Sequence, residues 1–78
     1  MNIQRVMEKK VNDKYVVTDV NTDVAYVYQS LANDLVNKKL RSCNYIRAIS
    51  YKPLYNGFQQ ICVYYTNNTR CIYTITDH

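Results

Sequence analysis

The chain has 78 residues, which is enough for one small domain and too few for a large buried core. Hydrophobic residues make up 47% of the chain and charged residues 21%, a balance that excludes a disordered polypeptide. The formal net charge of +4 permits contact with nucleic acid or with an acidic protein surface, but it requires neither. We therefore expect residues 1–78 to form a single globular domain.

The composition also bears on origin and compartment. Nine Tyr residues and many Asn, Lys and Ile residues stand against one Gly, one Pro and no Trp, as A/T-rich codon usage would produce. This bias suggests a low-GC bacterium, its phage or another mobile element. No apolar run is long enough to cross a membrane, and the N-terminal residues lack an export signal. Three cysteines without C-x-x-C spacing favour reduced thiols, so we expect a cytoplasmic protein with no membrane contact.

The first half of the chain predicts two short elements and one long helix. Ile3, Val6, Met7 and Val11 recur at helical spacing, which favours a short helix over residues 2–10, although a frayed strand also fits. Residues 15–18 are β-branched and aromatic, as in a short strand.

The clearest helix extends from about residue 22 to residue 42. Asn21 or Thr22 is the expected N-cap, and Asp23 stands in the first turn. The apolar face is formed mainly by Val24, Val27, Tyr28, Leu31 and Leu35.

The second half predicts a meander of three strands over residues 45–53, 58–66 and 69–76. Asn56-Gly57 is the strongest hairpin signal, and Asn67-Asn68 marks a second two-residue turn. The fold class is therefore α+β: a three- to four-stranded antiparallel sheet with one long helix packed on one face.

Two-residue turns would fix the register and thus the two faces of the sheet. The helix is expected to lie on the small and β-branched face, which is formed by Ile46, Ala48, Ser50, Ile61, Val63, Ile72 and Thr74. The opposite face would be rich in tyrosine and is formed by Tyr45, Arg47, Ile49, Tyr51, Phe58, Cys62, Tyr64, Cys71, Tyr73 and Ile75. If residues 1–11 do not fold over it, this second face is an exposed aromatic patch of the kind that marks an interaction site.

The sequence offers no catalytic set, metal site or cofactor site. The single histidine, His78, is the last residue and has no fixed position for a general base. Cys62 and Cys71 would lie diagonally across two strands, about 7 Å apart at Cα, too far for an easy disulfide. Together with Cys43 they lack a fourth ligand for a metal ion. We therefore expect a protein that is not an enzyme.

The leading hypothesis is a small protein-binding module of a phage or mobile element, an inhibitor or regulator of a host protein of the counter-defence type. Its partner would be that host protein or a second copy of the chain, with a homodimer the first form to test. The alternative is a nucleic-acid-binding protein that uses the same face and the basic clusters. The residues expected to bind are Tyr45, Arg47, Tyr51, Tyr64, Tyr73, Lys38 and Lys39.

Overall fold

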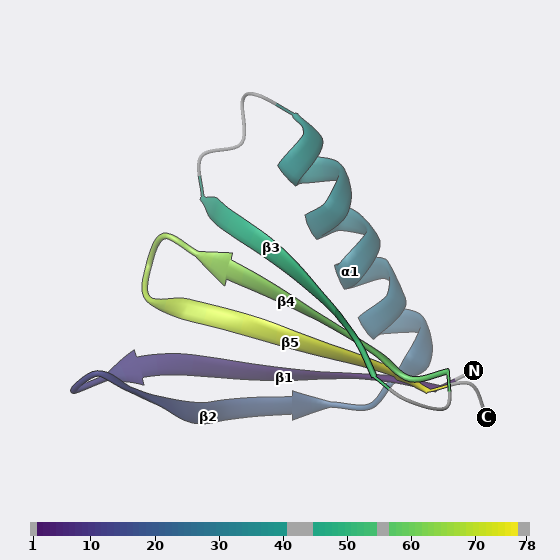
Figure 1. Ribbon diagram of the computed structural model, residues 1–78, viewed down its shortest axis with the longest axis horizontal. Helices are drawn as coiled ribbons and strands as arrows, with labels where there is room; N and C mark the ends of the chain where they lie inside the picture. The colour runs from purple at the N-terminus through teal and green to yellow at the C-terminus, as the bar shows by residue number, and fades with distance from the viewer. Residues whose placement is uncertain (1, 41–44, 55–56, 77–78) are drawn as a thin grey trace.

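A computed structural model describes residues 2–40, 45–54 and 57–76. The described chain forms one antiparallel sheet of five strands and one helix (Figure 1). The strands lie side by side in the order β2-β1-β5-β4-β3. In chain order the elements are β1 (Asn2–Val11), β2 (Lys14–Asn21), α1 (Val24–Lys39), β3 (Ile46–Pro53), β4 (Gln59–Tyr65) and β5 (Thr69–Thr76).

The helix packs on one face of the sheet, where it contacts β1 and β3. The predicted α+β architecture is therefore confirmed, and so is the meander of β3, β4 and β5. The sheet is wider than the meander because the N-terminal residues add two strands to it. In Figure 1 the hairpin of β1 and β2 extends to the left, well beyond the end of the sheet that α1 covers.

The predicted helix over residues 2–10 is wrong, because this segment is β1, an inner strand between β2 and β5. Its apolar residues serve two faces: Ile3 and Met7 point toward the helix, whereas Val6 points away from it. Such a two-sided pattern imitates helical spacing over a short window. Asn12 and Asp13 both have positive φ, at 52° and 63°, and join β1 to β2 in a two-residue turn.

The long helix is confirmed in position but is shorter than predicted. Asp23 is the N-cap, since its side chain accepts a hydrogen bond from the Tyr26 backbone N–H at 3.0 Å. Asn21 Oδ1 accepts from the Asp23 N–H at 2.9 Å and so supports the cap. The helix ends at Lys39, with Leu40 as its C-cap, and the predicted extension to residue 42 lies outside the described residues.

Both hairpins of the meander are one residue longer than predicted. Leu54 N–H donates to Phe58 O at 2.8 Å, and Gly57 has a φ of 76°. Between β4 and β5, Tyr64 pairs with Arg70, and Asn68 has a φ of 64°. A loop of three residues that ends in a left-handed residue is the other common hairpin connection. Asn56, predicted at the first tip, lies outside the described residues.

The longer loops reverse the predicted facing of β4 relative to its neighbours. Ile49 pairs with Val63, and Val63 pairs with Cys71, so odd-numbered residues of all three strands share one face. The predicted tyrosine-rich face is therefore wrong as a single surface. Its members on β3 and β5 lie on the helix side, whereas those on β4 lie on the opposite side. The residues on the helix side include Ile49, Tyr51, Cys71, Tyr73 and Ile75, and those on the opposite side include Cys62 and Tyr64.

The predicted helix-packing face is corrected in the same way. Ile46, Ile61 and Val63 do lie under α1, but Ala48, Ser50, Ile72 and Thr74 face away from it. Ile46 lies on the helix side although its number is even, because the ladder of β3 and β4 is irregular between Ile46 and Ala48.

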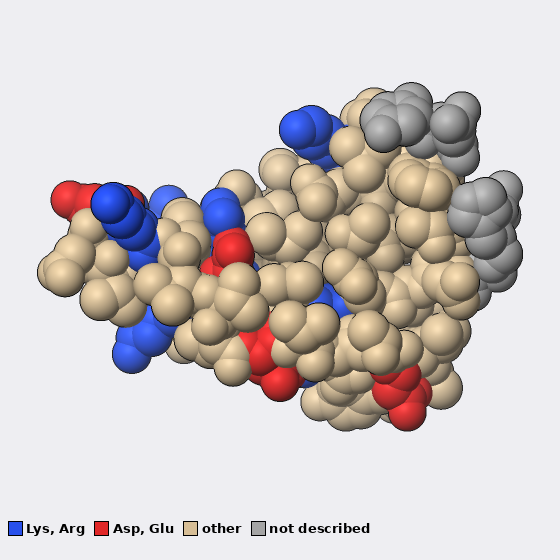
Figure 2. Space-filling view, turned by 90° about the horizontal axis from the view of Figure 1, so that it is seen from below, with Lys and Arg blue, Asp and Glu red and all other residues tan. Residues whose placement is uncertain are grey.

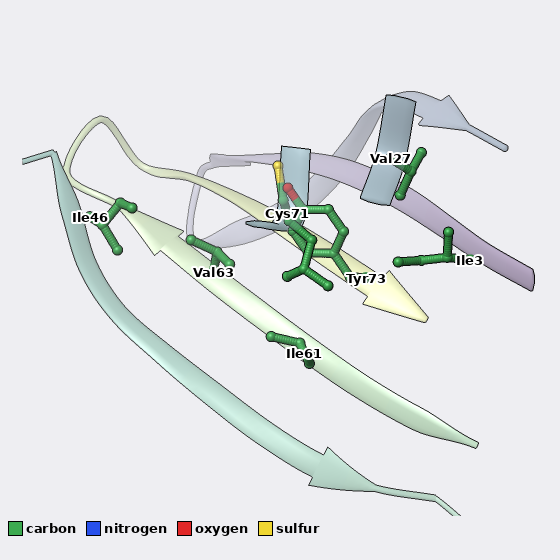
Figure 3. Close-up of a cluster of buried hydrophobic side chains, with 8 residues drawn as sticks. Ile3, Val27, Ile46, Ile61, Val63, Cys71 and Tyr73 are labelled. Atoms are coloured by element: carbon green, nitrogen blue, oxygen red, sulfur yellow. The ribbon is translucent and has the colours of Figure 1, made fainter. Parts of the chain in front are cut away.

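The core lies between α1 and the odd-numbered residues of β1, β4 and β5. Figure 3 shows Tyr73 in the middle of this cluster, with Val27 and Ile3 to one side and Val63 and Ile61 to the other. Tyr73 is fully buried, with an exposed fraction of 0%. Its ring thus fills the space that a smaller β-branched residue would leave empty beneath the helix.

The cysteines agree with the prediction of reduced thiols as far as they are described. Cys62 and Cys71 are free, and they project from opposite faces of the sheet because Cys62 pairs with Ile72 and Cys71 with Val63. Burial raises the pKa of the Cys71 thiol, which makes it less reactive. Cys43 lies outside the described residues.

Helix packing can be tested with a pair of substitutions on α1. Leu31 is buried against the core, so Leu31→Ala should lower the free energy of unfolding by about 2–5 kcal/mol, as for other buried leucines. Val36 on the same helix is largely exposed, and Val36→Ala should change it by less than about 0.5 kcal/mol. Urea denaturation followed by circular dichroism measures both. Equal costs would contradict the packing of α1 through the Leu31 side.

Candidate functional site

The predicted binding residues are distributed over four parts of the molecule. Tyr73 is in the core, so it cannot contact a partner. Tyr64 lies on the face of the sheet that α1 does not cover. Tyr45 lines a groove beside α1, and the exposed Arg47 accepts a hydrogen bond at its backbone O from Lys38 Nζ at 3.4 Å. The structure therefore does not bring these residues together as one site.

Three of the predicted residues do meet. Tyr51 of β3, with an exposed fraction of 66%, lines a surface pocket of about 390 Å³ with Lys38 and Lys39 from the last turn of α1. Leu35 and Ile49 form its floor. This pocket holds two cations beside one aromatic ring, but it has no polar group buried within it.

Among the described residues, α1 covers one side of the sheet, and we call the other side the open face. It is formed by Gln4, Val6, Glu8, Lys10, Tyr15, Val17, Val20, Ala48, Ser50, Lys52, Gln60, Cys62, Tyr64, Arg70, Ile72 and Thr74. The pairing places Val20, Val6, Ile72 and Cys62 side by side across four strands. This apolar row follows the hydrogen-bonding direction of the sheet, so it is a continuous stripe.

The charges of the open face centre on Arg70. Arg70 Nε lies 2.6 Å from Glu8 Oε1, and its guanidinium stacks on the Tyr15 ring at 3.6 Å from the ring centre. Lys10 and Lys52 add two positive charges, and neither ion pair of the described residues involves a lysine. Viewed from the β2 edge in Figure 2, charged side chains gather at the hairpin end of β1 and β2, while the broad part is mainly neutral.

A second polar feature is buried on the helix side. Arg5 Nη1 donates to Ser30 Oγ at 3.0 Å, and Ser30 Oγ lies 2.9 Å from Tyr73 Oη. Tyr73 Oη donates to Asp34 Oδ2 at 2.9 Å, and Tyr65 Oη donates to the same oxygen at 2.5 Å. Because Tyr73 gives its proton to Asp34, Ser30 must be the donor to Tyr73. We call this chain of bonds the hydroxyl relay, since two hydroxyls connect a cation to a carboxylate.

Both ends of the hydroxyl relay are taken out of water. Arg5 and Asp34 each have an exposed fraction of 8%. Arg5 Nη2 also lies 3.6 Å from Asp19 Oδ2, and its guanidinium lies 5.2 Å from the centre of the Tyr26 ring. Arg5 therefore has a direct carboxylate partner, whereas neither ion pair of the described residues includes Asp34. A buried carboxylate that meets only neutral hydroxyls recovers little of its desolvation cost. An apolar core would be simpler, so the hydroxyl relay is a candidate for a functional role.

A polar groove lies next to the hydroxyl relay and shares two residues with it. Its volume is about 430 Å³, within the range of small-molecule sites, and it is lined by Tyr26, Gln29, Ser30, Asn33, Asp34, Asn37 and Tyr45. The Tyr45 ring stacks on Tyr65, with the ring centres 6.3 Å apart and the planes at 11°. Asn37 Nδ2 donates to Tyr45 Oη. The groove thus has walls that the core and the helix hold in place.

Sequence reasoning missed Arg5, Ser30, Asp34 and Tyr65. One signal was present: Asp34 follows Val27 and Leu31 at intervals of four and three residues, so it lies on the buried stripe of the helix. A carboxylate on such a stripe needs donors, and tyrosines on the facing strands can supply them. The wrong register placed one of them, Tyr73, on the opposite face.

Comparison with known proteins adds no assignment. No family model matches the chain, and no curated protein or solved structure matches it either. Within the described residues, no group of three or more His, Cys, Asp or Glu side chains is arranged to hold a metal ion. The one helix in that part of the chain is too short and too polar to cross a bilayer.

Alkaline titration tests the hydroxyl relay. Burial, together with the nearby Asp34 carboxylate, raises the pKa of both Tyr65 and Tyr73 above the ordinary tyrosine value of 10.0. We expect these two phenols to ionise only as the protein unfolds, which absorbance at 295 nm measures. In Tyr65→Phe and Tyr73→Phe variants, the absorbance that accompanies unfolding should fall by one phenolate each.

The same shifts fix the direction of the pH dependence of stability. The two pKa values are higher in the folded than in the unfolded state, so the folded state keeps protons that the unfolded state releases. Their contribution is complete below about pH 10 and decreases as the pH rises further. A free energy of unfolding that stays constant above that pH would contradict the hydroxyl relay.

Proposed function

We propose that the chain is a non-enzymatic protein-binding module and that its open face is the binding surface. The observation that carries this proposal is an apolar stripe across four strands over which no described helix or strand packs. The stripe is formed by Val20, Val6, Ile72 and Cys62. The N-terminal residues, which were considered as a cover for the opposite face, are used as β1 within the sheet. An uncovered apolar stripe on a small domain favours contact with another molecule.

The size of the open face suits a specific protein interface. Five strands spaced about 4.8 Å apart, with about six residues each, give a projected area of roughly 500 Å². Side chains that stand above this plane raise the accessible area toward the roughly 800 Å² per partner of a standard interface. The open face is thus large enough for a stable protein contact.

Charge favours a partner that is not a second copy. The open face has a net charge of +2, because it carries three cations and one anion. The cations are Lys10, Lys52 and Arg70, and the anion is Glu8. Two copies facing each other would oppose +2 with +2. A partner with an apolar patch edged by carboxylates complements both the stripe and the lysines. The homodimer stays a prediction that the same experiment tests.

Nucleic acid suits this surface less well. Bases stack on exposed aromatic rings, whereas the row across the open face is aliphatic apart from Cys62. Of the two tyrosines on this face, Tyr15 is covered by Arg70 at 3.6 Å, which leaves Tyr64. Arg70 is neutralised by Glu8. The A/T-biased composition adds the narrower hypothesis that the partner is a host protein and the chain its inhibitor, encoded by a phage or mobile element.

Two valines on β2 provide a matched test. Val20, with an exposed fraction of 55%, is on the open face, and Val16, at 51%, projects to the other side of the same strand. Tagged protein should capture a partner from a nuclease-treated lysate of a low-GC bacterium. Val20→Asp should abolish capture, Tyr64→Ala should weaken it by about 1–2 kcal/mol, and Val16→Asp should leave it unchanged.

Thermal unfolding confirms first that each variant is folded. Equal capture by the Val20→Asp and Val16→Asp variants would overturn the open face as the binding surface. Loss of every partner on nuclease treatment would instead support nucleic acid. Light scattering measures the oligomeric state. A dimer of the unsubstituted protein and a monomer of the Val20→Asp variant would show that the open face binds a second copy and not an acidic partner.

A further inference from the structure

The groove beside α1 contains one strong acceptor that the protein leaves unused. Asp34 Oδ2 accepts both tyrosine hydroxyls, but no hydrogen bond within the described residues uses Asp34 Oδ1. Among the side-chain N and O atoms of the described residues, only Arg5 Nε is fully buried without a hydrogen-bond partner. Asp34 Oδ1, which also has no partner among them, is therefore not fully buried. Asp34 is one of the residues that line the groove.

The charge carried by the lining residues themselves is negative, and the Arg5 guanidinium contacts two of them, Ser30 and Tyr26, without lining the groove. Asp34 is the one charged residue among those that line it, and neither ion pair of the described residues includes Asp34. Arg5 reaches Asp34 only through Ser30 and Tyr73. A carboxylate that is mostly buried without a direct cation lacks its strongest partner, which is a charged N–H donor.

The other walls of the groove suit the rest of such a ligand. Tyr26 and Tyr45 provide aromatic surface for an alkyl chain, and the side-chain amides of Asn33, Asn37 and Gln29 provide further acceptors for N–H groups. Tyr45 is fixed by its stacking on Tyr65. Little has to be ordered when a ligand binds, because the hydroxyl relay already holds Asp34 and the stack holds Tyr45.

We propose that this groove binds a primary alkylammonium group, with the ammonium on Asp34 Oδ1 and the alkyl chain against the two tyrosines. An anionic ligand would meet the Asp34 carboxylate and is disfavoured. A metal ion would find one carboxylate and no second acidic, histidine or cysteine ligand among the lining residues. This site is on the helix side, away from the open face. The test of this site is therefore independent of the test of the proposed function.

Titration with n-butylammonium chloride tests the site by protein NMR. The side-chain amide signals of Asn33 and Asn37 should shift and saturate in the millimolar range, the affinity expected of so small a ligand. Sodium chloride and n-butanol at equal concentrations should not reproduce the shifts, because one lacks the alkyl chain and the other the charge. Asp34→Asn should weaken binding at least about tenfold by removing the charge-assisted bond.

Asp13→Asn is the matched control, because it removes the same charge at the tip of the β1–β2 turn and should leave the affinity unchanged. If Asp34→Asn unfolds the protein, Tyr45→Ala tests the alkyl contact and should weaken binding by about threefold or more. Shifts that fail to saturate, or that persist in the folded Asp34→Asn variant, would overturn the proposal.

Two further ligands distinguish whether the natural ligand is a free amine or the side chain of a lysine residue. 1,4-Diaminobutane represents a free amine, and Nα-acetyl-lysine methylamide represents the lysine side chain of a peptide. Tighter binding of the first assigns the groove to small amines, and tighter binding of the second assigns it to lysine residues. Failure of both to compete with n-butylammonium would contradict a specific site.

Discussion

The buried hydrogen bonds to Asp34 are the constraint on which the helix side of this protein depends. Asp34 comes from α1, Tyr73 from β5 and Tyr65 from β4, while Ser30 carries the chain of bonds on to Arg5 in β1. Four elements therefore meet at two charges and three hydroxyls. Apolar packing alone would allow the helix to slide or rotate on the sheet, because it is not directional. The hydroxyl relay restricts α1 to the position in which every donor finds its acceptor.

Most of the elements could be predicted from the sequence, but the first strand and the faces of the sheet could not. Regular alternation and turn residues located β3, β4 and β5, and helical spacing located α1. The register depended on whether each loop had two residues or three, and Gly57 and Asn68 serve equally well as the left-handed residue of the longer loop. A difference of one residue turns a strand over. The tyrosines of β4 and β5 were thereby assigned to one face although they lie on two.

The candidate sites were predictable to a similar degree. The open face was expected as an uncovered surface, and Tyr64 was correctly placed opposite the helix. Its apolar stripe was not expected, since Val6 was assigned to a short helix and the strand predicted over residues 15–18 stops short of Val20. The groove depends on long-range contacts between α1 and Tyr45, and no local pattern encodes them. Sequence periodicity reports which residues are buried, but it does not report which of them touch.

The pairing of β1 with β5 has a consequence for how the sheet assembles. Ile3 lies opposite Ile75, so the central ladder joins the first and the last strand of the described chain. During synthesis, β1, β2 and α1 emerge before the strand that completes their core. Until β5 arrives, Asp34 lacks the Tyr73 donor and β1 has one unpaired edge. Closing such a distant contact is slow compared with forming local hairpins. The nascent chain therefore exposes an open strand edge for most of its synthesis, when a chaperone or another nascent chain would compete for it.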